Sequence, residues 1–456
     1  MSILNNALSG AIASQVALSA SSQNVANLQT KGYTRQSALL GAVAPSAGSN
    51  QAGNGVRVTA LTRFSDGYKT QQLWRSASDL GARSQTQPYL TQLEQVMGDD
   101  TASLSSGVDA FFSALNAVAG VDPTSTPLRQ QVVTSAGLLA QRFNSLNNVY
   151  NAQLQSVRQQ RSALVDSANS TIASIASLNA EIANANATGS NASSLVDARD
   201  QAIDSLASQM GLEVSDQPDG TRNVSLKTGQ SLVLGGVAGK LTIGGGAAQT
   251  FGLTFAGTAF DIDATRAGGQ LGGLSTYEQD TLLPLQQGVA DLAQQIADKV
   301  NTQLAAGYAM DGTPGKPLLV YNPGSTSNML QVADGYQTSD LAFSGDGTPG
   351  DTGNLQKLVA IKSQPVTLTR VGTVMLSDAD TQLVGRLAVD SQQNKSALTT
   401  AQTMRDQAQA DWQSTSGVNQ DEEAVHLVEY QNMYQANMKV MSVANALFDA
   451  TLQMMG

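Results

Sequence analysis

The residues that could carry acid–base or nucleophilic chemistry are few in this chain. Its 456 residues include one histidine, His426, and no cysteine. A Ser-His-Asp site would need His426 as its base, but His426 stands beside Leu427 in a stretch of apolar residues with heptad spacing. This context favours a histidine that is exposed to solvent or held in an interface. Because cysteine is absent, the chain forms no disulfide, thiolate nucleophile, iron–sulfur cluster or cysteine-based zinc site.

The carboxylates and glycines do not form a recognised site either. The aspartates at positions 261 and 263, and those at 346 and 351, lack the full ligand pattern of an EF-hand. The glycine run at 244–246 lacks the lysine and the helix start of a phosphate loop. The acidic run at 421–423 falls where we expect a helix to begin, and a helix dipole favours anions there. We therefore expect no enzyme, no cofactor and no metal site. Paired carboxylates of the glycosidase type stay open, because no pair stands out.

Composition excludes further classes of protein. The chain has 25 basic and 36 acidic residues, a net charge of −11, and only 13% charged residues, against about 25% in ordinary soluble domains. An acidic chain poor in charge binds nucleic acid badly, because phosphates need clustered Lys and Arg. There is no run of about 18 apolar residues, so we expect no membrane insertion. The N-terminus lacks a basic region, so we expect no cleaved signal peptide. The length predicts two or three domains.

The two ends of the chain have matching helical patterns. Apolar residues recur every seven positions near the start, and Leu8 and Ile12 widen the stripe; its members are Leu4, Ala11, Leu18 and Val25. A glycine at 32 can end such a helix in the left-handed conformation. The same period returns near the end of the chain at Leu427, Tyr434, Met441 and Phe448, with Leu452 on the flank. Asn419 fits an N-cap there, with Glu422 at capping-box spacing.

These stripes have two interpretations. Each helix could simply pack in a globular core, or the two could pair with each other or with copies in neighbouring subunits. The narrow stripe and the polar remainder favour assembly of the coiled-coil kind. Because an isolated helix of this type is marginal in water, we expect both ends to be largely unfolded in the free monomer and to become ordered on assembly.

The middle of the chain predicts a long helical rod with a β insertion. Apolar residues between 139 and 182 follow a 3.6-residue period, and no Pro or Gly interrupts residues 138–187. Further helices are expected at 65–97, with a break at Pro88, and at 105–119, 193–210, 276–306 and 378–414. Short strands separated by Gly-rich turns are expected between 212 and 262, besides others at 56–60, 318–321 and 367–369.

The predicted class is mainly α with an inserted small β domain, an α+β arrangement. The expected domains are an inner coiled-coil-like domain of terminal helices (1–40 with 416–456), a long-helix bundle (41–210 with 270–415) and an outer β insertion (211–269).

The sequence SQNVANLQTKGYTR at 22–35 resembles the S-x-N-x-A-N-x-x-T-x-G-Y signature of the flagellar axial proteins, which are the rod, hook and hook-associated proteins. Three further stretches resemble the hook-associated protein 1 family in particular. They are FFSAL with DPTS and LRQQV at 111–132, LVDARDQ at 195–201, and SGVNQDEE at 416–423 followed by the C-terminal heptads. Flagellin and hook-associated protein 3 lack the first signature, and hook protein lacks the long helical rod.

The resemblance implies a structural protein at the junction of hook and filament. It implies export of the unfolded chain through the flagellar export channel, an extracellular location on the bacterial flagellum, and a ring of identical subunits at the distal end of the hook. The implied partners are other copies of the chain, hook protein, hook-associated protein 3 and a cytoplasmic export chaperone that binds the C-terminal helix.

The resemblance also assigns residues. Leu4, Leu8, Ala11, Leu18 and Val25 would form the inner N-terminal helix. Leu427, Tyr434, Met441, Phe448 and Leu452 would be its C-terminal partners and the chaperone-binding face. Asn27, Thr30, Gly32 and Tyr33 would form the joint between the inner and helical domains.

Some features depart from larger members of the family. One short β insertion is evident, so a second outer domain is expected to be missing, and GYAMDG at 307–312 differs from the family pattern. Two alternatives stay open: a hook or distal-rod protein of the same class, or a secreted enzyme or adhesin with its site in 211–269 or 307–376.

Overall fold

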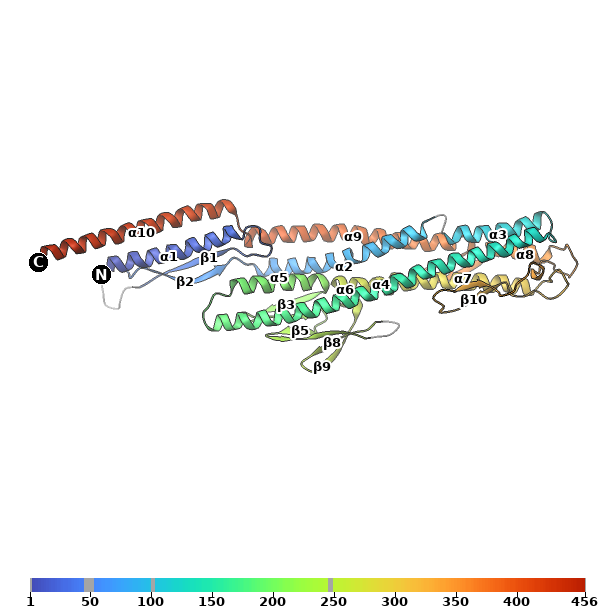
Figure 1. The fold of residues 1–456 in the computed structure, drawn as a ribbon, viewed down its shortest axis with the longest axis horizontal. Helices are drawn as coiled ribbons and strands as arrows, with labels where there is room; N and C mark the ends of the chain where they lie inside the picture. Colours follow the sequence, from blue (N-terminus) through green and yellow to red (C-terminus); the bar gives the residue numbers. More distant parts are fainter. Residues whose placement is uncertain (1, 45–52, 100–102, 245–248, 456) are drawn as a thin grey trace.

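The computed structural model describes residues 2–44, 53–99, 103–244 and 249–455, and the molecule is long and thin (Figure 1). Helices run along its length, with small antiparallel sheets attached to them. The two ends of the chain lie at the same end of the molecule (Figure 1). The predicted class, mainly α with a small β component, is confirmed.

The α-helices cover most of the chain. They are α1 (Ser2–Ala26), α2 (Gly67–Met97), α3 (Leu104–Gly120), α4 (Thr126–Ala187), α5 (Ser193–Gln209), α6 (Gly269–Tyr277), α7 (Leu283–Ala305), α8 (Gly353–Ala360), α9 (Ala379–Ser416) and α10 (Gln420–Met455). A π-helix, η2 (Glu278–Leu282), joins α6 to α7, and short 3₁₀ helices are η1 (Ala264–Arg266), η3 (Thr338–Asp340), η4 (Ile361–Ser363) and η5 (Leu376–Asp378).

The predicted rod is the helix α4. Its 62 residues correspond to about 93 Å at the usual rise per residue. The helix begins twelve residues before the predicted start at 138, because Pro127 in its first turn favours a helix start and Gly137 is accommodated within the helix. The residues with the 3.6-residue period are buried, except Leu154, which is partly buried, so the periodic prediction identified the core-facing side of α4.

The prediction that α2 breaks at Pro88 is wrong. α2 continues through Pro88, which costs the hydrogen bond that residue 88 would donate to the carbonyl of Ser84. Both residues are exposed, so water can satisfy that carbonyl.

The helical bundle is closely packed where α2 meets α5 and α6. A Cβ atom added to Gly81 of α2 would lie 2.1 Å from the carbonyl oxygen of Ser208, and one added to Gly273 of α6 would lie 2.5 Å from that of Ala82. Such approaches require glycine, because the obstacle is backbone rather than a movable side chain. On its other side α2 packs along α9.

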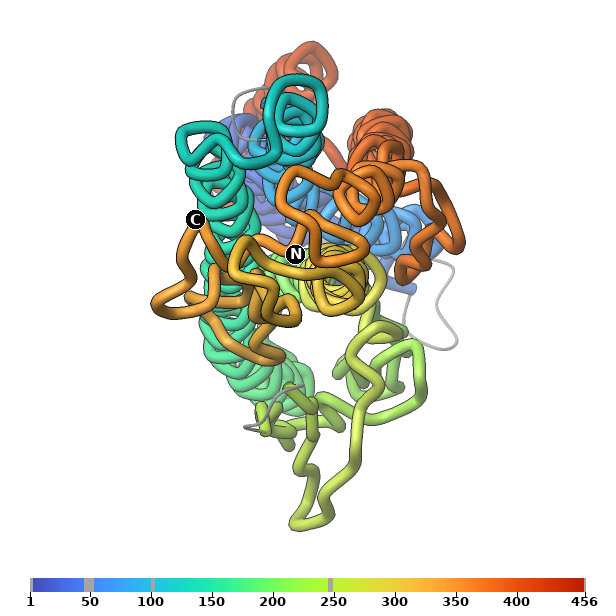
Figure 2. The backbone as a smooth tube through the Cα atoms, turned by 90° about the vertical axis from the view of Figure 1, so that its right-hand side faces the viewer, coloured from blue at the N-terminus to red at the C-terminus, as the bar shows by residue number. Residues whose placement is uncertain are grey.

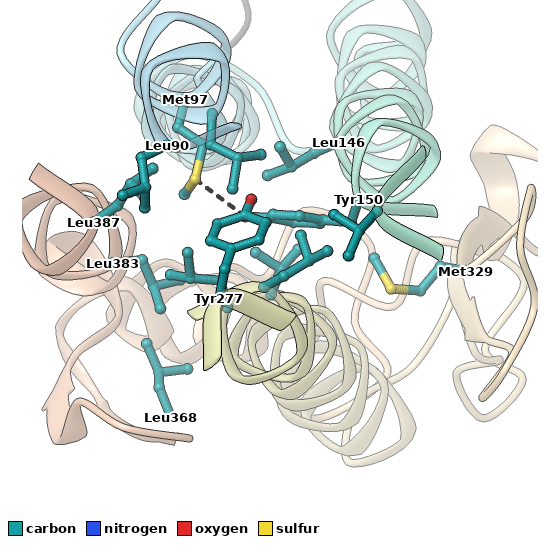
Figure 3. Close-up of a cluster of buried hydrophobic side chains, with 14 of the residues drawn as sticks. Leu90, Met97, Leu146, Tyr150, Tyr277, Met329, Leu368, Leu383 and Leu387 are labelled. Carbon is teal, nitrogen blue, oxygen red and sulfur yellow. Dashed lines mark hydrogen bonds between the residues drawn. The ribbon is translucent and has the colours of Figure 1, made fainter. Parts of the chain in front are cut away.

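Two buried tyrosines mark the centre of the bundle (Figure 3). Tyr150 of α4 is fully buried, and its hydroxyl donates to the sulfur of Met97 at 3.0 Å. Tyr277 at the end of α6 donates to the Oε1 of Gln153 at 2.5 Å. Each hydroxyl has a partner, as buried polar groups require.

A buried ion pair lies where α6 turns into the π-helix. Arg161 of α4 pairs with Glu278, and the two side chains are 2% and 4% exposed. Arg158 approaches the same carboxylate at 3.4 Å. Burial lowers the pKa of Arg161, and the charge of Glu278 opposes that shift. The π-helix, which widens one helical turn, begins at the residue that pairs with α4.

The β insertion packs on α4 as two sheets. The first has the order β3 (Leu212–Asp216), β4 (Arg222–Leu226), β5 (Ser231–Leu234) and β6 (Val237–Ala238), and the second has the order β7 (Lys240–Ile243), β8 (Phe251–Phe255) and β9 (Thr258–Ile262). The hairpin of β8 and β9 projects from the bundle at the bottom of Figure 2. The strands expected between 212 and 262 are confirmed, whereas most of the glycine run at 244–246 lies outside the described residues.

Three small hairpins complete the fold. They are β1 (Gln36–Ala42) with β2 (Val56–Arg63), β10 (Leu319–Tyr321) with β11 (Leu330–Val332), and β12 (Pro365–Leu368) with β13 (Gly372–Met375). The strands β2, β10 and β12 were expected from the sequence, whereas their partner strands were not. In β1 the apolar residues do not alternate, so no period indicated a strand.

Candidate assembly site at the terminal helices

The terminal helices α1 and α10 form an antiparallel pair beyond the end of the bundle (Figure 1). Two close contacts show how they are aligned. The side chain of Asn437 lies against Gly10, where an added Cβ would be 2.5 Å from its Oδ1. Farther along, Ser21 donates to the carboxylate of Glu423. The pair therefore brings the first and last segments of the sequence together within one chain.

The buried face of α1 is built from small side chains. Its members are Ala7, Ala11, Ala13, Ser14, Ala17, Ala20, Ser21 and Asn24. α1 packs against α10 and against the hairpin of β1 and β2, and it contains no charged residue. Small residues allow close approach of neighbouring backbones, and their burial leaves the larger apolar side chains of the same helix facing outward.

Of the N-terminal residues singled out from the sequence, only Ala11 belongs to this buried face. Leu18 is partly buried, whereas Leu4, Leu8 and Val25 are 37%, 45% and 37% exposed. Most of the leucine stripe therefore stays exposed to solvent in the single chain.

The C-terminal residues divide in the same way. Leu427 and Met441 are partly buried along α1, and Tyr434 is 37% exposed. Phe448 and Leu452 are 64% and 54% exposed. α10 has 36 residues and α1 has 25, so the last part of α10 extends past the start of α1 (Figure 1) and presents its apolar side chains to solvent.

A buried carboxylate joins the two helices at the bundle end of the pair. Glu423 is 2% exposed, and its oxygens accept hydrogen bonds from Ser21 and, at 3.0 Å, from the Nδ2 of Asn24. The Oδ1 of Asn24 accepts from the Tyr33 hydroxyl at 2.9 Å and from the Gln36 backbone N–H at 3.0 Å. Asn24 thus connects α1, α10, the turn after α1 and β1. Burial raises the pKa of Tyr33 to about 12, and the charges of Asp197 and Glu423 add to the shift.

His426 lies next to this cluster but in the wrong arrangement for nucleophilic catalysis. Its Nδ1 is 4.0 Å from Glu423, its side chain is 41% exposed, and its ring lies 5.8 Å from that of Tyr430. The Ser21 hydroxyl donates directly to Glu423 rather than to His426. A serine nucleophile needs the histidine as its hydrogen-bond partner, so these three residues do not form such a site.

The signature residues 27–33 form the turn that follows α1. Asn27 accepts from the Thr30 hydroxyl at 3.1 Å, and the backbone N–H of Tyr33 donates to the Thr30 carbonyl at 3.2 Å. Gly32 has a φ of +81° and lies against Gln201 of α5. The left-handed residue expected from the sequence is therefore present, although α1 itself already ends at Ala26.

The start of α10 is capped and attached to the same turn. The Oδ1 of Asn419 accepts from the backbone N–H of Asp421 at 3.0 Å, as an N-cap does. The carboxylate of Glu422 pairs with Arg35, whose guanidinium lies 4.4 Å from the ring centre of Phe64. Glu422 thus binds across to the signature segment, where capping-box spacing predicted a bond back to Asn419.

An ion cluster connects this region to the rod. Arg63, at the end of β2, pairs with Asp197 of α5 and lies 3.7 Å from Asp200. Asp197 also accepts from the Thr34 backbone N–H at 3.3 Å, and Arg63 donates to the Thr34 hydroxyl at 3.0 Å.

Asp200 extends the cluster into the β insertion. It pairs with Arg222 of β4 and, at 3.2 Å, with Arg199. The Arg199 side chain is 2% exposed and donates to the Gly220 carbonyl at 2.7 Å, and burial lowers its pKa. The stretch LVDARDQ, which carried part of the resemblance, thus supplies carboxylates that connect three parts of the molecule. These parts are the rod α4, the β insertion, and the terminal unit, by which we mean α1, the β1–β2 hairpin and α10.

The far end of the rod has its own buried cation. Arg129 is 2% exposed and donates to three backbone carbonyls, including those of Thr338 and Pro123 at 2.8 and 2.7 Å. Its guanidinium carbon lies 4.6 Å from the ring centre of Phe343. Burial lowers the pKa of Arg129 to about 10, so it stays charged at neutral pH and fixes the loops around 338–343 to α4.

The residues that make these connections had no role predicted from the sequence. Asn24, Glu423 and the charged residues of α5 belong to the stretches that carried the resemblance, whereas Ser21 and Arg63 lie outside them. Within the described ranges, no group of three or more His, Asp or Glu side chains is placed to hold a metal ion. None of the described helices is long and apolar enough to cross a membrane.

A model of the flagellar hook-associated protein FlgK helical domain matches residues 90–319, half of the chain. The chain belongs to the FlgK family. It is therefore a structural component of the bacterial flagellum, as the resemblance implied, and this family is not a class of enzymes. A second model, of the flagellar basal body rod FlgEFG protein C-terminal region, matches residues 412–454, so α10 of this chain has a pattern that is similar to that of the FlgEFG rod proteins.

Full-length relatives agree with this assignment. Flagellar hook-associated protein 1 of Escherichia coli K12 is 27% identical over 548 aligned residues, covering 99% of both chains. The protein of the same name from Bacillus subtilis is 25% identical, covering 97% of this chain and 96% of that one. The E. coli alignment is 92 positions longer than this chain of 456 residues, so that FlgK protein carries segments that this one lacks.

A solved FlgK structure resembles part of the chain. The flagellar hook junction protein FlgK from Burkholderia pseudomallei matches with a TM-score of 0.52 and 28% identity. The match covers 55% of this chain and 47% of that one.

Proposed function

We propose that this FlgK protein forms the junction between the flagellar hook and the filament, as a ring of identical subunits held together through α1 and α10. The observation that carries this proposal is the terminal helix pair. The buried apolar residues of α1 are all alanines, and large apolar side chains such as Leu8 and Phe448 stay exposed on the two helices. Such a surface in a soluble molecule marks a site of association.

A closed ring can be stable even when each contact between neighbouring subunits is weak. Buried apolar surface contributes about 25 cal/mol per Å², and each subunit of a ring is held by neighbours on both sides, so modest interfaces add through avidity. α1 carries no charge, so close packing of copies of this helix requires no desolvation of ionised groups.

The proposed partners are other copies of the chain, hook protein below, and hook-associated protein 3 above. The exposed end of α10, with Phe448 and Leu452, is the face that we assign to a cytoplasmic export chaperone before assembly. The protein would be exported unfolded through the flagellar export apparatus and would act outside the cell.

The contacts of the hairpin support a revised division of the chain. The sequence-based division ended the inner domain at residue 40, within β1. Because β1 and β2 both pack along α1, we propose that the inner unit continues to Arg63, at the end of β2, and resumes at α10.

Removal of the chain from Phe448 onward tests the function. We expect the truncated protein to keep a folded rod, to lose chaperone binding, and to leave cells with hooks that shed filament subunits into the medium. Circular dichroism, a pull-down with the chaperone and immunoblots of the medium measure the three effects.

A matched control replaces exposed apolar residues far from the terminal helices. Val121 and Met375 are 78% and 50% exposed, and the double variant V121S/M375S should leave filaments attached. A strain that lacks the gene and still carries normal filaments on its hooks would contradict the proposal.

The match of residues 412–454 to rod proteins favours one alternative, a hook or distal-rod protein. Electron cryo-microscopy separates the two, because a hook or rod protein forms an extended tube and a junction protein forms one short zone.

A further inference from the structure

We propose that Asn54 is a site of spontaneous deamidation, and that the conversion loosens the contact between the β1–β2 hairpin and the first half of α1. The Asn-Gly dipeptide occurs once in the sequence, at 54–55. Glycine after asparagine is the most permissive neighbour for this reaction, because it has no side chain to obstruct the attacking backbone nitrogen.

The chemistry needs only water. The backbone nitrogen of Gly55 attacks the Cγ of Asn54, forming an N–Cγ bond, and the Cγ–Nδ2 bond breaks. The proton of the Gly55 N–H leaves with the amide nitrogen as ammonia, and a five-membered succinimide remains. One water molecule then opens the ring at either carbonyl. The products are aspartate or isoaspartate, and isoaspartate adds one methylene group to the backbone.

The local structure leaves both reacting groups accessible. Asn54 is exposed, and to the described residues its side-chain amide makes a single hydrogen bond, from Nδ2 to the Ala44 carbonyl at 3.2 Å. Val43 faces two residues, since it accepts from the Asn54 N–H and donates to the Gly55 carbonyl, both at 2.9 Å. This two-against-one pairing is a β-bulge, which leaves a residue unpaired. The Gly55 N–H accordingly donates to none of the described residues.

Close packing against α1 explains why position 55 is a glycine, the residue that makes the preceding Asn54 prone to deamidation. Gly55 has a φ of +96°, and an added Cβ would lie 2.1 Å from the Oγ of Ser9 and 3.3 Å from the Cα of Asn6. The same helix residues hold the hairpin on both sides of the bulge. Ser9 accepts from the Val56 N–H at 3.2 Å, and Asn6 donates to the Gly53 carbonyl at 3.1 Å.

The consequence follows from this tight contact. An isoaspartate at 54 lengthens the backbone between two points, Gly53 and Val56, that are each hydrogen-bonded to α1. One of those bonds must lengthen or break, and the new carboxylate has no amide proton to give to Ala44. The first turns of α1, which carry the exposed residues Leu4 and Leu8, then lose part of their support.

The test uses the full-length protein, incubated folded at mildly alkaline pH, with a urea-denatured sample as the positive control for the chemistry. Trypsin cleaves after Arg35 and Arg57 and releases residues 36–57, which contain both Asn50 and Asn54. Fragment-ion masses assign the conversion to one of these two asparagines, and isoaspartate methyltransferase labels the product. We expect Asn54 to convert several-fold faster than Asn50 in the folded chain.

The structural effect is measured by hydrogen–deuterium exchange of α1 in fresh and aged protein. Exchange in the first three turns should rise several-fold in the aged wild type and stay unchanged in aged N54Q, whose longer side chain cyclises slowly. An Asn54 that stays intact in the folded chain while it converts in urea would overturn the proposal. So would conversion of Asn54 without a change in the exchange of α1.

Discussion

Glu423 is buried between the terminal helices with two neutral donors, Ser21 and Asn24, on its oxygens. A buried carboxylate is costly unless its acceptor sites are filled, so this position ties the start of α10 to one face of α1. Glu422, the next residue back along the chain, is 53% exposed and makes an ion pair with Arg35. The two neighbouring glutamates therefore have different roles, one structural and buried, the other at the surface.

Replacing Glu423 with alanine should loosen α1 more than the same change at Glu422. The first change leaves the Ser21 hydroxyl without its acceptor and the Asn24 amide with only the Gln36 carbonyl, at a cost of about 1–3 kcal/mol. The second removes a surface ion pair worth about 1 kcal/mol at most. Hydrogen exchange of α1 residues 14–24 measures the difference, and equal exchange in E423A and E422A would contradict it.

In the described part of the chain, five turns share one motif, an aspartate whose carboxylate accepts from the backbone N–H of the threonine two residues later. The aspartates are Asp122, Asp219, Asp263, Asp311 and Asp346. Hydrogen bonds from these threonines lower the pKa of each carboxyl group. The lowered value means that the ionised form stabilises the turn in the folded state.

The motif predicts a defined pH dependence. Because the folded pKa values are lowered, the stabilisation is complete above the unfolded value of about 4 and is lost as the pH falls through the folded values. The variant D311N should therefore have a lower urea midpoint than the wild type at neutral pH, and the two midpoints should converge in acid. A difference that is the same at both pH values would show that the charge of Asp311 is not involved.

The contacts that connect α1 to α10 and the β1–β2 hairpin to α5 could not be predicted from the sequence, because the residues that form them are too far apart in the chain. Ser21 and Glu423 are separated by 402 residues, and Arg63 and Asp197 by 134. Local patterns report on neighbours in one helix or strand, so they identified Asn419 as an N-cap but gave no role to Asn24.

At the scale of elements, periodic burial made the rod predictable. Every turn of α4 places residues on the same core, so the 3.6-residue period extends over many turns. The terminal helices show where this reasoning fails. Their heptads of large apolar residues were expected to pair with each other or with copies in neighbouring subunits. Within the single chain α1 buries mainly alanine and serine, and these small residues give no strong hydrophobic period.

The close crossing of α2 with α5 leads to a prediction. In G81A the new methyl group would meet the Ser208 carbonyl, so the backbones must separate, at a cost of about 1–3 kcal/mol. The matched control is G385A in α9, where nothing lies within 4 Å of the added Cβ; alanine should stabilise that helix by roughly 0.5–1 kcal/mol. Thermal unfolding should lower the midpoint for G81A and raise it for G385A, and opposite signs would refute the assignment.

At the scale of the whole molecule, the terminal unit and the rod are connected by little covalent chain. Residues 64–66 join β2 to α2, and residues 417–419 join α9 to α10. The remaining connection is the turn 27–35, which touches α5 through Gly32 and Thr34. The rod has its own large core, whereas the buried apolar residues of α1 are all alanines.

The stability of the free monomer should therefore differ along its length. We expect hydrogen exchange to be slow in α4, faster in α1, and fastest in α10 beyond Leu447, because that end extends past α1 and gains no partner until assembly. Backbone exchange rates of the monomer and of assembled hooks measure this. Terminal helices as protected as α4 in the free monomer would contradict the expectation that they become ordered on assembly.

The general architecture and the presence of a single β insertion were accessible from the sequence, whereas the segments that larger relatives carry were not. The β insertion was visible because Gly-rich turns separate its strands. The 92 additional positions in the alignment with the E. coli FlgK protein have no counterpart in this chain from which they could be inferred.

The single helix α4 also has a mechanical consequence. A continuous helix of 62 residues resists bending, whereas the terminal unit is connected to the bundle by two segments of three residues each. A sideways force on α4 is therefore transmitted to its end, and the strain concentrates at these two connecting segments. The force that returns the terminal unit to its position comes from ion pairs, above all those of Arg63 with Asp197 and Asp200. We therefore expect the subunit to yield by tilting at these connections rather than by bending. Its compliance should change little with salt, because the side chains of Arg63, Asp197 and Asp200 are only 14%, 12% and 19% exposed and salt screens partly buried pairs much less than exposed ones.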